Sequence, residues 1–395
     1  MSNHQFFGVD FYKTDELLNE RERSMRDTAH AFVTGEVLPI IKNHHREGTF
    51  PTELISKMGE LGFFGANLQG YGCLSINNIE YGLIMQELER GDSSIRSFAS
   101  VQSALGMFPI FAFGSEEQKE HWLPLLRDGK AISCFGLTEP DHGSDPANMK
   151  TKAIKTKNGF VLSGEKTWIT NGDIADIAVV WAKLNGEIRG FLVPKGTAGF
   201  TATRIEGKFS LRASITSSLS FSECVIPEKN ILPGTILPPG KKGLISALKC
   251  LNQARYGIAW GAVGAAMACY HAALDYAKTR EQFGKPIASR QLVQEKLVAM
   301  LSAITNAQLK CIRLGQLKDA GSVTPTQISL AKRDNVAMAL DCARTARDIL
   351  GAAGITDGHP IIRHLLNLES VKTYEGTHDI HTLILGKEIT GIDAF

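Results

Sequence analysis

The stretch NGFVLSGEKTWITNGDIADIAVVWAKLNGEIRGFLV, residues 158–193, contains short apolar runs separated by turn-forming residues. β-Type runs occur at 159–162, 167–170, 177–182 and 191–193. Asn158-Gly159 and Asn185-Gly186 are strong hairpin signals, because both central residues of a type I′ turn need a positive φ. The pattern predicts a β-rich domain in the middle of the chain.

Helical patterns lie on both sides of this region. Apolar residues recur at helical spacing in four earlier segments, 14–37, 53–61, 79–90 and 116–127, and Pro39 is expected to end the first. The Pro- and Gly-rich stretch from Leu232 to Lys242 is typical of an exit linker, and long helical patterns follow from Leu244. The predicted fold is α+β and multidomain. It comprises a helical N-terminal domain over 1–130, a β-domain over 131–237 and a helical C-terminal domain over 238–395.

This order of elements and the composition argue against several classes of protein. A helical, β, helical order does not suit a parallel α/β sheet, and neither a strand-linked G-x-G-x-x-G nor a G-x-x-x-x-G-K-[ST] occurs. The 395 residues carry 43 Lys and Arg against 41 Asp and Glu, scattered along the chain, for a net charge of +2. Without a basic cluster to grip phosphates, nucleic acid is not an expected partner.

Cysteine usage and the N-terminus bear on location. The seven cysteines form no C-x-x-C pair, which favours reduced, packed thiols. The first residues include acidic side chains and no apolar run, so we expect a cytoplasmic protein, or a mitochondrial matrix protein if a transit peptide has been removed. The uncharged stretch 256–274 contains Gly257 and Gly261 in G-x-x-x-G spacing. Its Gly and Ala content and His271 favour a packed bundle helix, so no membrane span is expected.

One C-terminal motif places a carboxylate beside a glycine. In Thr373 to His381, TYEGTHDIH, Gly376 follows Glu375 and allows backbone to approach a ligand. From these residues alone, a surface carboxylate at a helix break is the stronger interpretation. His378 and His381 lie on neighbouring turns, but no third ligand is evident, so no metal site is predicted.

Three other motifs have a structural and a functional interpretation each. The stretch 134–145 offers clustered amides and hydroxyls, or is simply a turn. Trp168, followed by Ile169 and Thr170, is either an aromatic wall for a ligand or a core residue of a strand. Arg280, close to Phe283, either supplies charge to a pyrophosphate or complements the dipole at a helix C-terminus.

Taken together, in this order and at these spacings, the motifs resemble the acyl-CoA dehydrogenase family over essentially the whole chain. Within the family the sequence is most similar to the glutaryl-CoA dehydrogenases. The blocks that carry the similarity are Gln86 to Arg90, Ser93 to Ser97, Ser100 to Ser103, Gly207 to Ser214, Cys250 to Gly261 and Tyr374 to Phe395. Three positions depart from the family pattern: Ile95 in place of an aromatic residue, Ala352-Ala353 in place of a second glycine, and the turn 70–73.

The resemblance implies a β-barrel middle domain, a C-terminal four-helix bundle, a homotetramer built from dimers, and FAD. Residues near the flavin would be Phe135, Leu137, Thr138, Gly143, Ser144, Trp168, Ile169, Thr170, Thr377 and Asp379. The adenosine and pyrophosphate parts would meet Arg280, Phe283 and Gln291, together with Leu350, Gly351 and Gly354 of a neighbouring subunit.

The resemblance also implies a reaction. Glu375 would remove the α-proton of an acyl-CoA, and electrons would pass to electron-transfer flavoprotein. Arg96, Ser97 and Glu87 would select glutaryl-CoA, whose oxidative decarboxylation gives crotonyl-CoA and CO₂. The remaining substrate-binding residues would be Ser144, Arg255, Tyr374 and Gly376. Four alternatives stay open: a dehydrogenase for another short-chain acyl-CoA, an oxidase, a non-decarboxylating glutaryl-CoA dehydrogenase, and a non-catalytic flavin- or CoA-binding relative.

Overall fold

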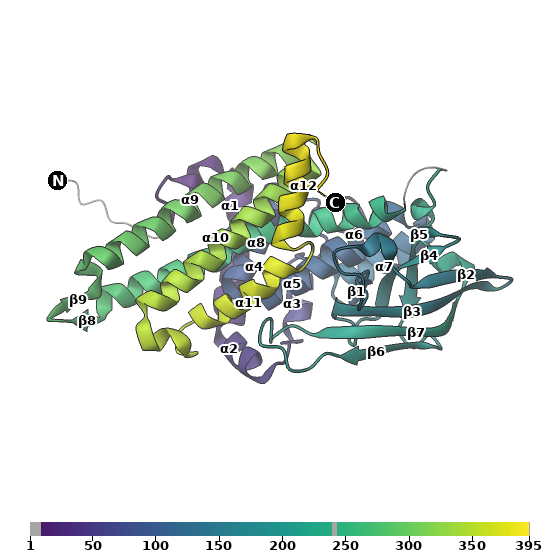
Figure 1. Ribbon diagram of the computed structural model, residues 1–395, viewed down its shortest axis with the longest axis horizontal. Helices are drawn as coiled ribbons and strands as arrows, with labels where there is room; N and C mark the ends of the chain where they lie inside the picture. Colours follow the sequence, from purple (N-terminus) through teal and green to yellow (C-terminus); the bar gives the residue numbers. More distant parts are fainter. Residues whose placement is uncertain (1–8, 239–242, 395) are drawn as a thin grey trace.

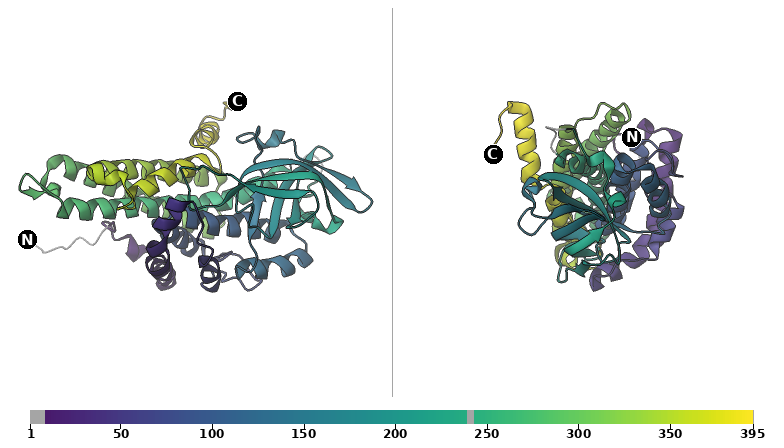
Figure 2. Two further views of the ribbon diagram at one scale, coloured as in Figure 1. Left: turned by 90° about the horizontal axis from the view of Figure 1, so that it is seen from below. Right: turned by 90° about the vertical axis from the view of Figure 1, so that its right-hand side faces the viewer.

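The computed structural model describes residues 9–238 and 243–394, and it is elongated, with a helical bundle at one end and a sheet at the other (Figure 1). The N-terminal helices pack along one side, as the turned view shows (Figure 2). Their bounds are α1 (Glu20–Phe32), α2 (Leu38–Glu47), α3 (Leu54–Glu60), α4 (Asn78–Gly91), α5 (Ser93–Ser100), α6 (Phe108–Phe113) and α7 (Glu116–Arg127). The predicted α+β organisation is confirmed.

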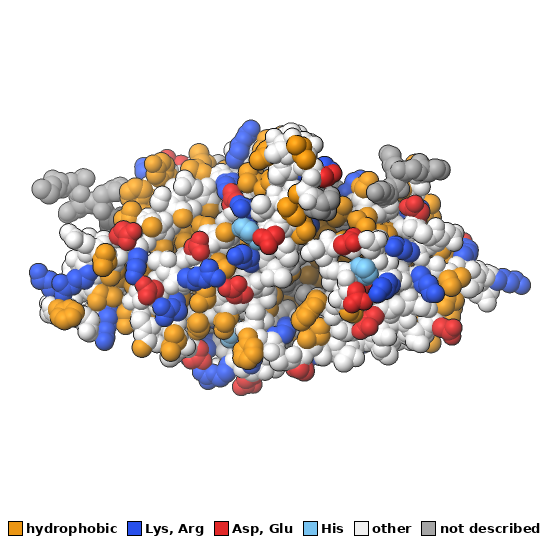
Figure 3. Space-filling view, viewed as in Figure 1, with side chains coloured by type: hydrophobic (Ala, Val, Ile, Leu, Met, Phe, Trp, Pro, Cys, Tyr) orange, Lys and Arg blue, Asp and Glu red, His pale blue; other side chains and the backbone are white. Residues whose placement is uncertain are grey.

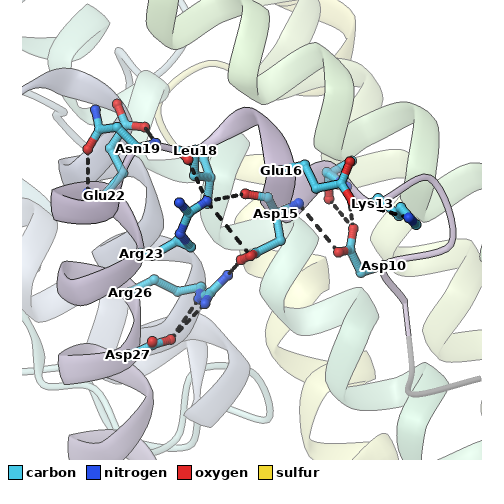
Figure 4. Close-up of polar contacts among 11 residues, drawn as sticks. Asp10, Lys13, Asp15, Glu16, Leu18, Asn19, Glu22, Arg23, Arg26 and Asp27 are labelled. Carbon is cyan, nitrogen blue, oxygen red and sulfur yellow. Dashed lines mark hydrogen bonds and ion pairs between the residues drawn. The ribbon is translucent and has the colours of Figure 1, made fainter.

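Local side-chain contacts explain where the N-terminal helices begin. Asn19 and Glu22 form a capping box at the start of α1, in which the Glu22 amide donates to Asn19 at 3.0 Å. Arg23 and Arg26 of α1 approach the carboxylate of Asp15, which lies in the turn before the helix, and so hold that turn against α1 (Figure 4). Equivalent capping boxes begin α4, α7 and α10.

Pro39 does not end the first helix, contrary to the sequence prediction. A π-helical segment, Val33–Val37, follows α1 directly, and Pro39 then lies in the first turn of α2. A proline is tolerated in a first helical turn because the amide it lacks would have no intrahelical acceptor there. The chain therefore stays helical through 20–47.

The middle domain is a single curved sheet of seven strands that forms an open half-barrel. Its strands are β1 (Ser133–Gly136), β2 (Lys152–Thr156), β3 (Gly159–Thr170), β4 (Ile177–Leu184), β5 (Glu187–Pro194), β6 (Phe200–Arg204) and β7 (Thr216–Ile226). The order is β1-β4-β2-β3-β7-β6, with β5 also on β4. A separate core that includes Leu162, Val180 and Leu219 fills its concave interior.

Both predicted hairpins are present, and one has the predicted turn. Asn185 and Gly186 have φ values of 52° and 84°, as a type I′ turn between β4 and β5 requires. In the other hairpin Thr156 pairs with Gly159, so the central residues are Lys157 and Asn158, and neither has a positive φ. Asn158-Gly159 therefore marks the hairpin but does not form a type I′ turn.

Long helices return after the sheet and form the C-terminal bundle. They are α8 (Leu244–Thr279), α9 (Gln291–Asp319), α10 (Pro325–Ile349) and α11 (Ile361–Thr373), and α12 (His378–Thr390) projects beside them near the β-domain (Figures 1 and 2). A two-stranded hairpin, β8 (Glu281–Gln282) and β9 (Lys285–Pro286), joins α8 to α9. The second part of the predicted linker, 239–242, lies outside the described residues.

Helix α8 is the one helix in the described part of the chain that is long and apolar enough to cross a membrane. Within its most apolar 18 residues, 72% are buried inside the protein, as expected for a bundle core helix. On the face shown in Figure 3, basic and acidic side chains are interspersed among apolar ones.

Glycines allow α8 to lie very close to α4. A Cβ atom on Gly264 would lie 1.9 Å from the Gln86 carbonyl oxygen, and one on Gly261 would lie 2.0 Å from a carboxylate oxygen of Glu89. A glycine on the other helix has the same effect, because Gly82 of α4 lies directly against the ring of Trp260 on α8. The Gly-rich composition that resembled a membrane helix thus serves close packing of two buried helices.

We predict that Gly264→Ala lowers the melting temperature clearly, because its new methyl group would meet backbone that cannot rotate away. Overpacking of this kind costs about 1 to 3 kcal/mol. Gly35→Ala is the matched control, since a Cβ there has nothing within 4 Å and alanine favours a helix. Equal melting temperatures for the two variants in a thermal unfolding experiment would contradict the packing argument.

Candidate active site

Glu375 lies in the short connection between α11 and α12, in an unusual backbone conformation. Its φ is 53°, and the next residue, Gly376, has a φ of 93°. The Thr377 hydroxyl then accepts a hydrogen bond from the Ile380 amide at 3.2 Å and begins α12. A left-handed conformation costs a non-glycine residue roughly 1 to 2 kcal/mol, so contacts elsewhere must hold Glu375 in place.

Two buried cations hold this connection by its carbonyl groups. Arg255 of α8 donates through Nε to the Glu375 carbonyl at 2.8 Å. Lys332 of α10 donates through Nζ to the carbonyls of Tyr374 at 3.1 Å and Gly376 at 2.8 Å. Three consecutive carbonyls therefore receive charged donors from two bundle helices.

The Glu375 carboxyl group itself is left without a partner. Its Oε2 atom has no hydrogen bond and no contact with solvent within the described structure, although the residue as a whole is only partly buried. Burial raises the pKa of Glu375 to about 7, against the opposing charges of Arg96, Arg255 and Lys332. A carboxyl group that titrates near neutral pH and has a free oxygen is suited to accept a proton from a bound molecule.

Arg96 is buried in the first turns of α5 and faces the same connection. Its Nε donates to Glu89 Oε2 at 2.6 Å, and its Nη2 donates to the hydroxyl of Tyr374, whose ring centre lies 5.6 Å from the guanidinium carbon. Burial would lower the pKa of Arg96, but Glu89 and Tyr374 raise it above its usual value. Among the described residues Nη1 has no hydrogen-bond partner, although Arg96 exposes only 1% of its surface.

Glu87, which the sequence analysis placed beside Arg96, lies on another face of α4. It accepts hydrogen bonds from Arg90 Nε at 2.6 Å and from His30 Nδ1 at 2.9 Å. Residues two apart on a helix are separated by about 200° around its axis, so Glu87 and Glu89 point in nearly opposite directions. The ion-pair partner of Arg96 is therefore Glu89, and contact of Glu87 with a substrate stays a prediction.

Ser97 lies next to Arg96 on α5 and is also buried. Ser144 is far more exposed, in the loop between β1 and β2 that also carries Gly143. The start of this loop is fixed from inside the sheet, because Lys166 Nζ donates to the Leu137 carbonyl at 3.0 Å and to Glu139 at 2.8 Å. Lys166 and Glu139 were not predicted as site residues.

The residues predicted to meet a flavin differ in exposure. Trp168 has a φ of 60°, sits at an irregularity in the β3–β7 pairing, and exposes 61% of its surface. This exposure favours the aromatic-wall interpretation over a core tryptophan. Ile169 points into the sheet core, Phe135 packs against Trp181, and Thr138 and Thr170 are partly buried.

The other predicted cofactor residues lie at the end of the molecule opposite the sheet. Arg280 ends α8, Phe283 is 94% exposed in the β8–β9 hairpin, and Gln291 begins α9. Leu350, Gly351 and Gly354 follow α10. Figure 1 shows the β8–β9 hairpin at the tip of the bundle that lies away from the sheet. One chain does not bring the two groups together, so their sharing across a subunit boundary stays a prediction.

Thr377 and Asp379 lie at the start of α12, beside Glu375, and Asp379 is exposed. His381, one turn further on, is buried with neither ring nitrogen hydrogen-bonded in the described structure. Burial, together with Lys332 and Arg255, lowers the pKa of His381 to about 3. Within 9–238 and 243–394, no group of three His, Cys, Asp or Glu residues is placed to hold a metal ion.

A buried polar network joins this region to the other two domains. The Asp92 carboxylate accepts from Arg363 Nη1 at 2.5 Å and from Asn367 Nδ2 at 3.0 Å, both on α11. Asn367 Oδ1 in turn accepts from the Leu211 amide of the β-domain at 2.9 Å. Asp92 also begins α5, the helix of Arg96, by accepting from the Ser94 amide at 2.7 Å. Arg96 and Glu375 are thus positioned by elements that share one ion pair.

Comparisons with known proteins agree along the whole chain. The family models described as acyl-CoA dehydrogenase N-terminal, middle and C-terminal domains match residues 19–130, 134–224 and 241–390. A crystal structure of glutaryl-CoA dehydrogenase from Mycobacterium smegmatis has a TM-score of 0.96 and 49% identity, covering 99% of this chain and 100% of that one.

A second structure of a glutaryl-CoA dehydrogenase from Mycobacterium smegmatis, in complex with FADH2, has a TM-score of 0.95 at 48% identity, covering 98% of this chain and 99% of that one. Among curated proteins, the mitochondrial short-chain specific acyl-CoA dehydrogenase of Rattus norvegicus is 35% identical over 383 residues. That match covers 95% of this chain and 91% of that protein.

The raised pKa of Glu375 predicts how the stability of the protein depends on pH. Because its folded pKa of about 7 lies above the ordinary 4.5, the native protein binds more protons than the unfolded chain between those values, and stability falls as the pH rises through this window. Gln at this position does not titrate. The stability of Glu375→Gln relative to wild type should therefore increase from pH 5 to pH 8, by about 2 to 3 kcal/mol. Melting temperatures across this range test it, and a pH-independent difference would contradict it.

Proposed function

The chain belongs to the acyl-CoA dehydrogenase family, and we propose that it oxidises glutaryl-CoA with FAD and releases CO₂ to give crotonyl-CoA. The observation that carries the proposal is the pairing of two groups at one connection. Glu375 offers an unpartnered carboxyl oxygen, and the buried Arg96 bonds the hydroxyl of Tyr374, the residue before it. The first group suits removal of an α-proton, and the second suits a substrate with a distal carboxylate.

The residues present fit a flavin in two respects. Trp168 exposes a broad aromatic surface from a strand irregularity, and Phe283 exposes another from the hairpin at the bundle tip. A similar structure contains FADH2, which supports the same cofactor for this chain. When bound, FAD supplies the acceptor for the hydride that leaves the β-carbon. Arg280, Phe283 and Gln291 would hold its adenosine end, with Leu350, Gly351 and Gly354 of a second subunit in a homotetramer.

Glu375 performs the proton transfers of the proposed reaction. Its peptide amide orients the thioester carbonyl, and its carboxylate removes the proton from the acidified α-carbon. A pKa near 7 is low enough for the group to be ionised at working pH and high enough for it to accept the proton. After loss of CO₂, the proton held by Glu375 returns to the carbon chain and crotonyl-CoA is complete.

Arg96 is the residue that favours glutaryl-CoA as the substrate. A substrate carboxylate buried without a cation would be costly, and a guanidinium can meet it with directed hydrogen bonds. Glu89 and Tyr374 occupy Nε and Nη2, so Nη1, which has no partner among the described residues, would receive the carboxylate. The two structures called glutaryl-CoA dehydrogenase, at 48 to 49% identity, support this choice. A dehydrogenase for another short-chain acyl-CoA is the second candidate, supported by the rat relative at 35%.

We propose electron-transfer flavoprotein as the acceptor that reoxidises the protein. This step rests on the family resemblance. It separates a dehydrogenase from an oxidase, in which oxygen would take the electrons.

The central experiment is to incubate the purified FAD-containing protein with glutaryl-CoA and an electron acceptor and to identify the product by mass. We expect crotonyl-CoA and one CO₂ for every two electrons passed to the acceptor. Glu375→Gln is the matched control, because an amide of the same shape cannot take the proton. It should keep its FAD and lose about 10²- to 10⁴-fold in the rate of flavin reduction.

Other outcomes distinguish the alternatives. A product that keeps both carboxyl groups would show oxidation without decarboxylation, and a clear preference for butyryl-CoA would favour the short-chain candidate. Rapid reoxidation by oxygen would indicate an oxidase. If Glu375→Gln keeps more than about a tenth of the wild-type rate, Glu375 is not the base; FAD binding without reduction by any acyl-CoA would indicate a non-catalytic relative.

Substrate selection by Arg96 is tested with Arg96→Met. We expect kcat/KM to fall for glutaryl-CoA by about 30-fold or more, since losing one member of a buried charge pair costs about 2 to 5 kcal/mol. Uncharged butyryl-CoA should lose far less. The variant also leaves Glu89 unpaired, so the double variant Glu89→Gln with Arg96→Met is the control that removes the stranded carboxylate. Equal losses for both substrates in the double variant would make Arg96 structural.

A further inference from the structure

Lys332 is a buried lysine with no carboxylate partner. It lies on α10, exposes 1% of its surface, and forms no ion pair with an Asp or Glu of the described chain. All three of its hydrogen bonds go to carbonyl groups of one short segment, those of Gly376 at 2.8 Å, Tyr374 at 3.1 Å and Lys372 at 3.5 Å. Every polar contact of this side chain is therefore with the connection that carries Glu375.

The location explains how a charge can be kept there. Lys372 is in the last turn of α11 and Tyr374 follows its end, so their carbonyls are among those that a helix leaves without partners. The negative end of the helix dipole favours a cation at this point. Burial still lowers the pKa of Lys332 to about 7, although Glu375 opposes the effect. The lysine is thus held at a cost that a purely apolar residue would avoid.

The three contacts fix the backbone on both sides of Glu375. Tyr374 precedes it and Gly376 follows it, and the same ammonium group binds both carbonyls. The carbonyl between them is held separately by Arg255. This leaves little freedom in a residue whose φ of 53° is otherwise unfavourable.

Gly376 allows this arrangement to be compact. A Cβ atom at this position would lie 2.9 Å from His381 Nε2 and 3.2 Å from Arg255 Nη2. A side chain there would push the connection away from the arginine. The glycine in the Glu375 motif is therefore needed for close approach to protein groups as well as for its φ of 93°.

We propose that Lys332 is a positioning residue for Glu375: it holds the carbonyls on either side in the left-handed turn, and its positive charge favours the carboxylate form. The inference rests on the proposed role of Glu375 as the base. Lys332 does not itself touch the reacting atoms in this proposal. It acts by fixing where the carboxyl oxygen points and at what pH it is ionised.

The charged and titratable groups around this position come from several elements. Arg255 of α8 and Arg96 of α5 contribute positive charge, and Glu89 of α4 pairs with Arg96. Tyr374, Tyr81 of α4, and His378 and the neutral His381 of α12 also lie near this position. Lys332 is the member of this set that both carries positive charge and binds the two carbonyls flanking Glu375.

The test uses two substitutions in the FAD-containing protein. Lys332→Met removes the hydrogen bonds and the charge. Lys332→Arg keeps a charge, but the N–H donors of a guanidinium lie in one plane, whereas those of an ammonium group point in three tetrahedral directions. Lys310→Met is the matched control, because Lys310 is a bundle lysine whose ion pair is with Asp334, away from the connection.

Flavin reduction by saturating acyl-CoA is measured against pH for each variant. For Lys332→Met we expect the rate to fall about tenfold or more and the acid limb to move upward by about one pH unit, because a stabilising charge is lost. For Lys332→Arg we expect a lower plateau with the limb nearly unchanged. Lys310→Met should match wild type in both respects.

The titration of Glu375 can also be followed without measuring activity. Melting temperatures are measured across pH for four proteins: wild type, Glu375→Gln, Lys332→Met and the double variant. The quantity of interest is the change in melting temperature caused by Glu375→Gln, first with Lys332 present and then with Met at that position. The difference should begin near pH 4.5 in both backgrounds, since the unfolded chain sets that limit, and the pH at which it levels off should move upward in the Lys332→Met background. If Lys332→Met does not fold, Lys332→Gln replaces it, since Gln keeps amide donors and removes the charge.

An unmoved acid limb and an unmoved melting difference in Lys332→Met would overturn the proposal and leave Lys332 as a packing residue. If instead Glu375 is not the base, the Glu375→Gln variant with Lys332 intact would still reduce flavin. The two results are read from separate variants.

Discussion

The structure depends on how charge is buried around one short connection between two helices. The Glu375 backbone has an unfavourable conformation, and its carboxyl oxygen has no partner. Both features persist because Arg255 and Lys332 donate to the carbonyls of this connection from α8 and α10. Buried cations usually stabilise carboxylates directly; here their hydrogen bonds go to the backbone, and the carboxyl group is affected only by their charge.

This arrangement requires the bundle and the N-terminal helices to lie close together. Glycines on α8 allow α4 to approach, and this places Glu89 against Arg96, which in turn reaches the Tyr374 hydroxyl. The Asp92–Arg363 ion pair sets the start of α5 against α11. Changes at the α4–α8 contact should therefore reach the site even though none of those glycines touches Glu375.

Much of the fold follows from local sequence. Asn185-Gly186 predicts its turn because few other pairs tolerate two positive φ values, and helical periodicity located α3, α4 and α7 to within one or two residues. Local patterns missed strand β7, whose residues are largely polar, and misplaced a helix end at Pro39 because a proline can begin a helix as well as end one. Glu375 was identified only through the family resemblance, since nothing in its spacing marks a base.

The sequence by itself determined the order of domains and the family, and it predicted the Glu375 motif and a substrate-binding role for Arg96, because these depend on residue type and local spacing. Tertiary structure alone decided which carboxylate meets Arg96, since Glu87 and Glu89 differ only in the face of α4 that they occupy. It also decided the role of Lys332, which lies 43 residues before Glu375 in a helix with no distinguishing motif. Contacts between side chains that far apart in the sequence depend on how the helices pack, and a local sequence pattern does not predict them.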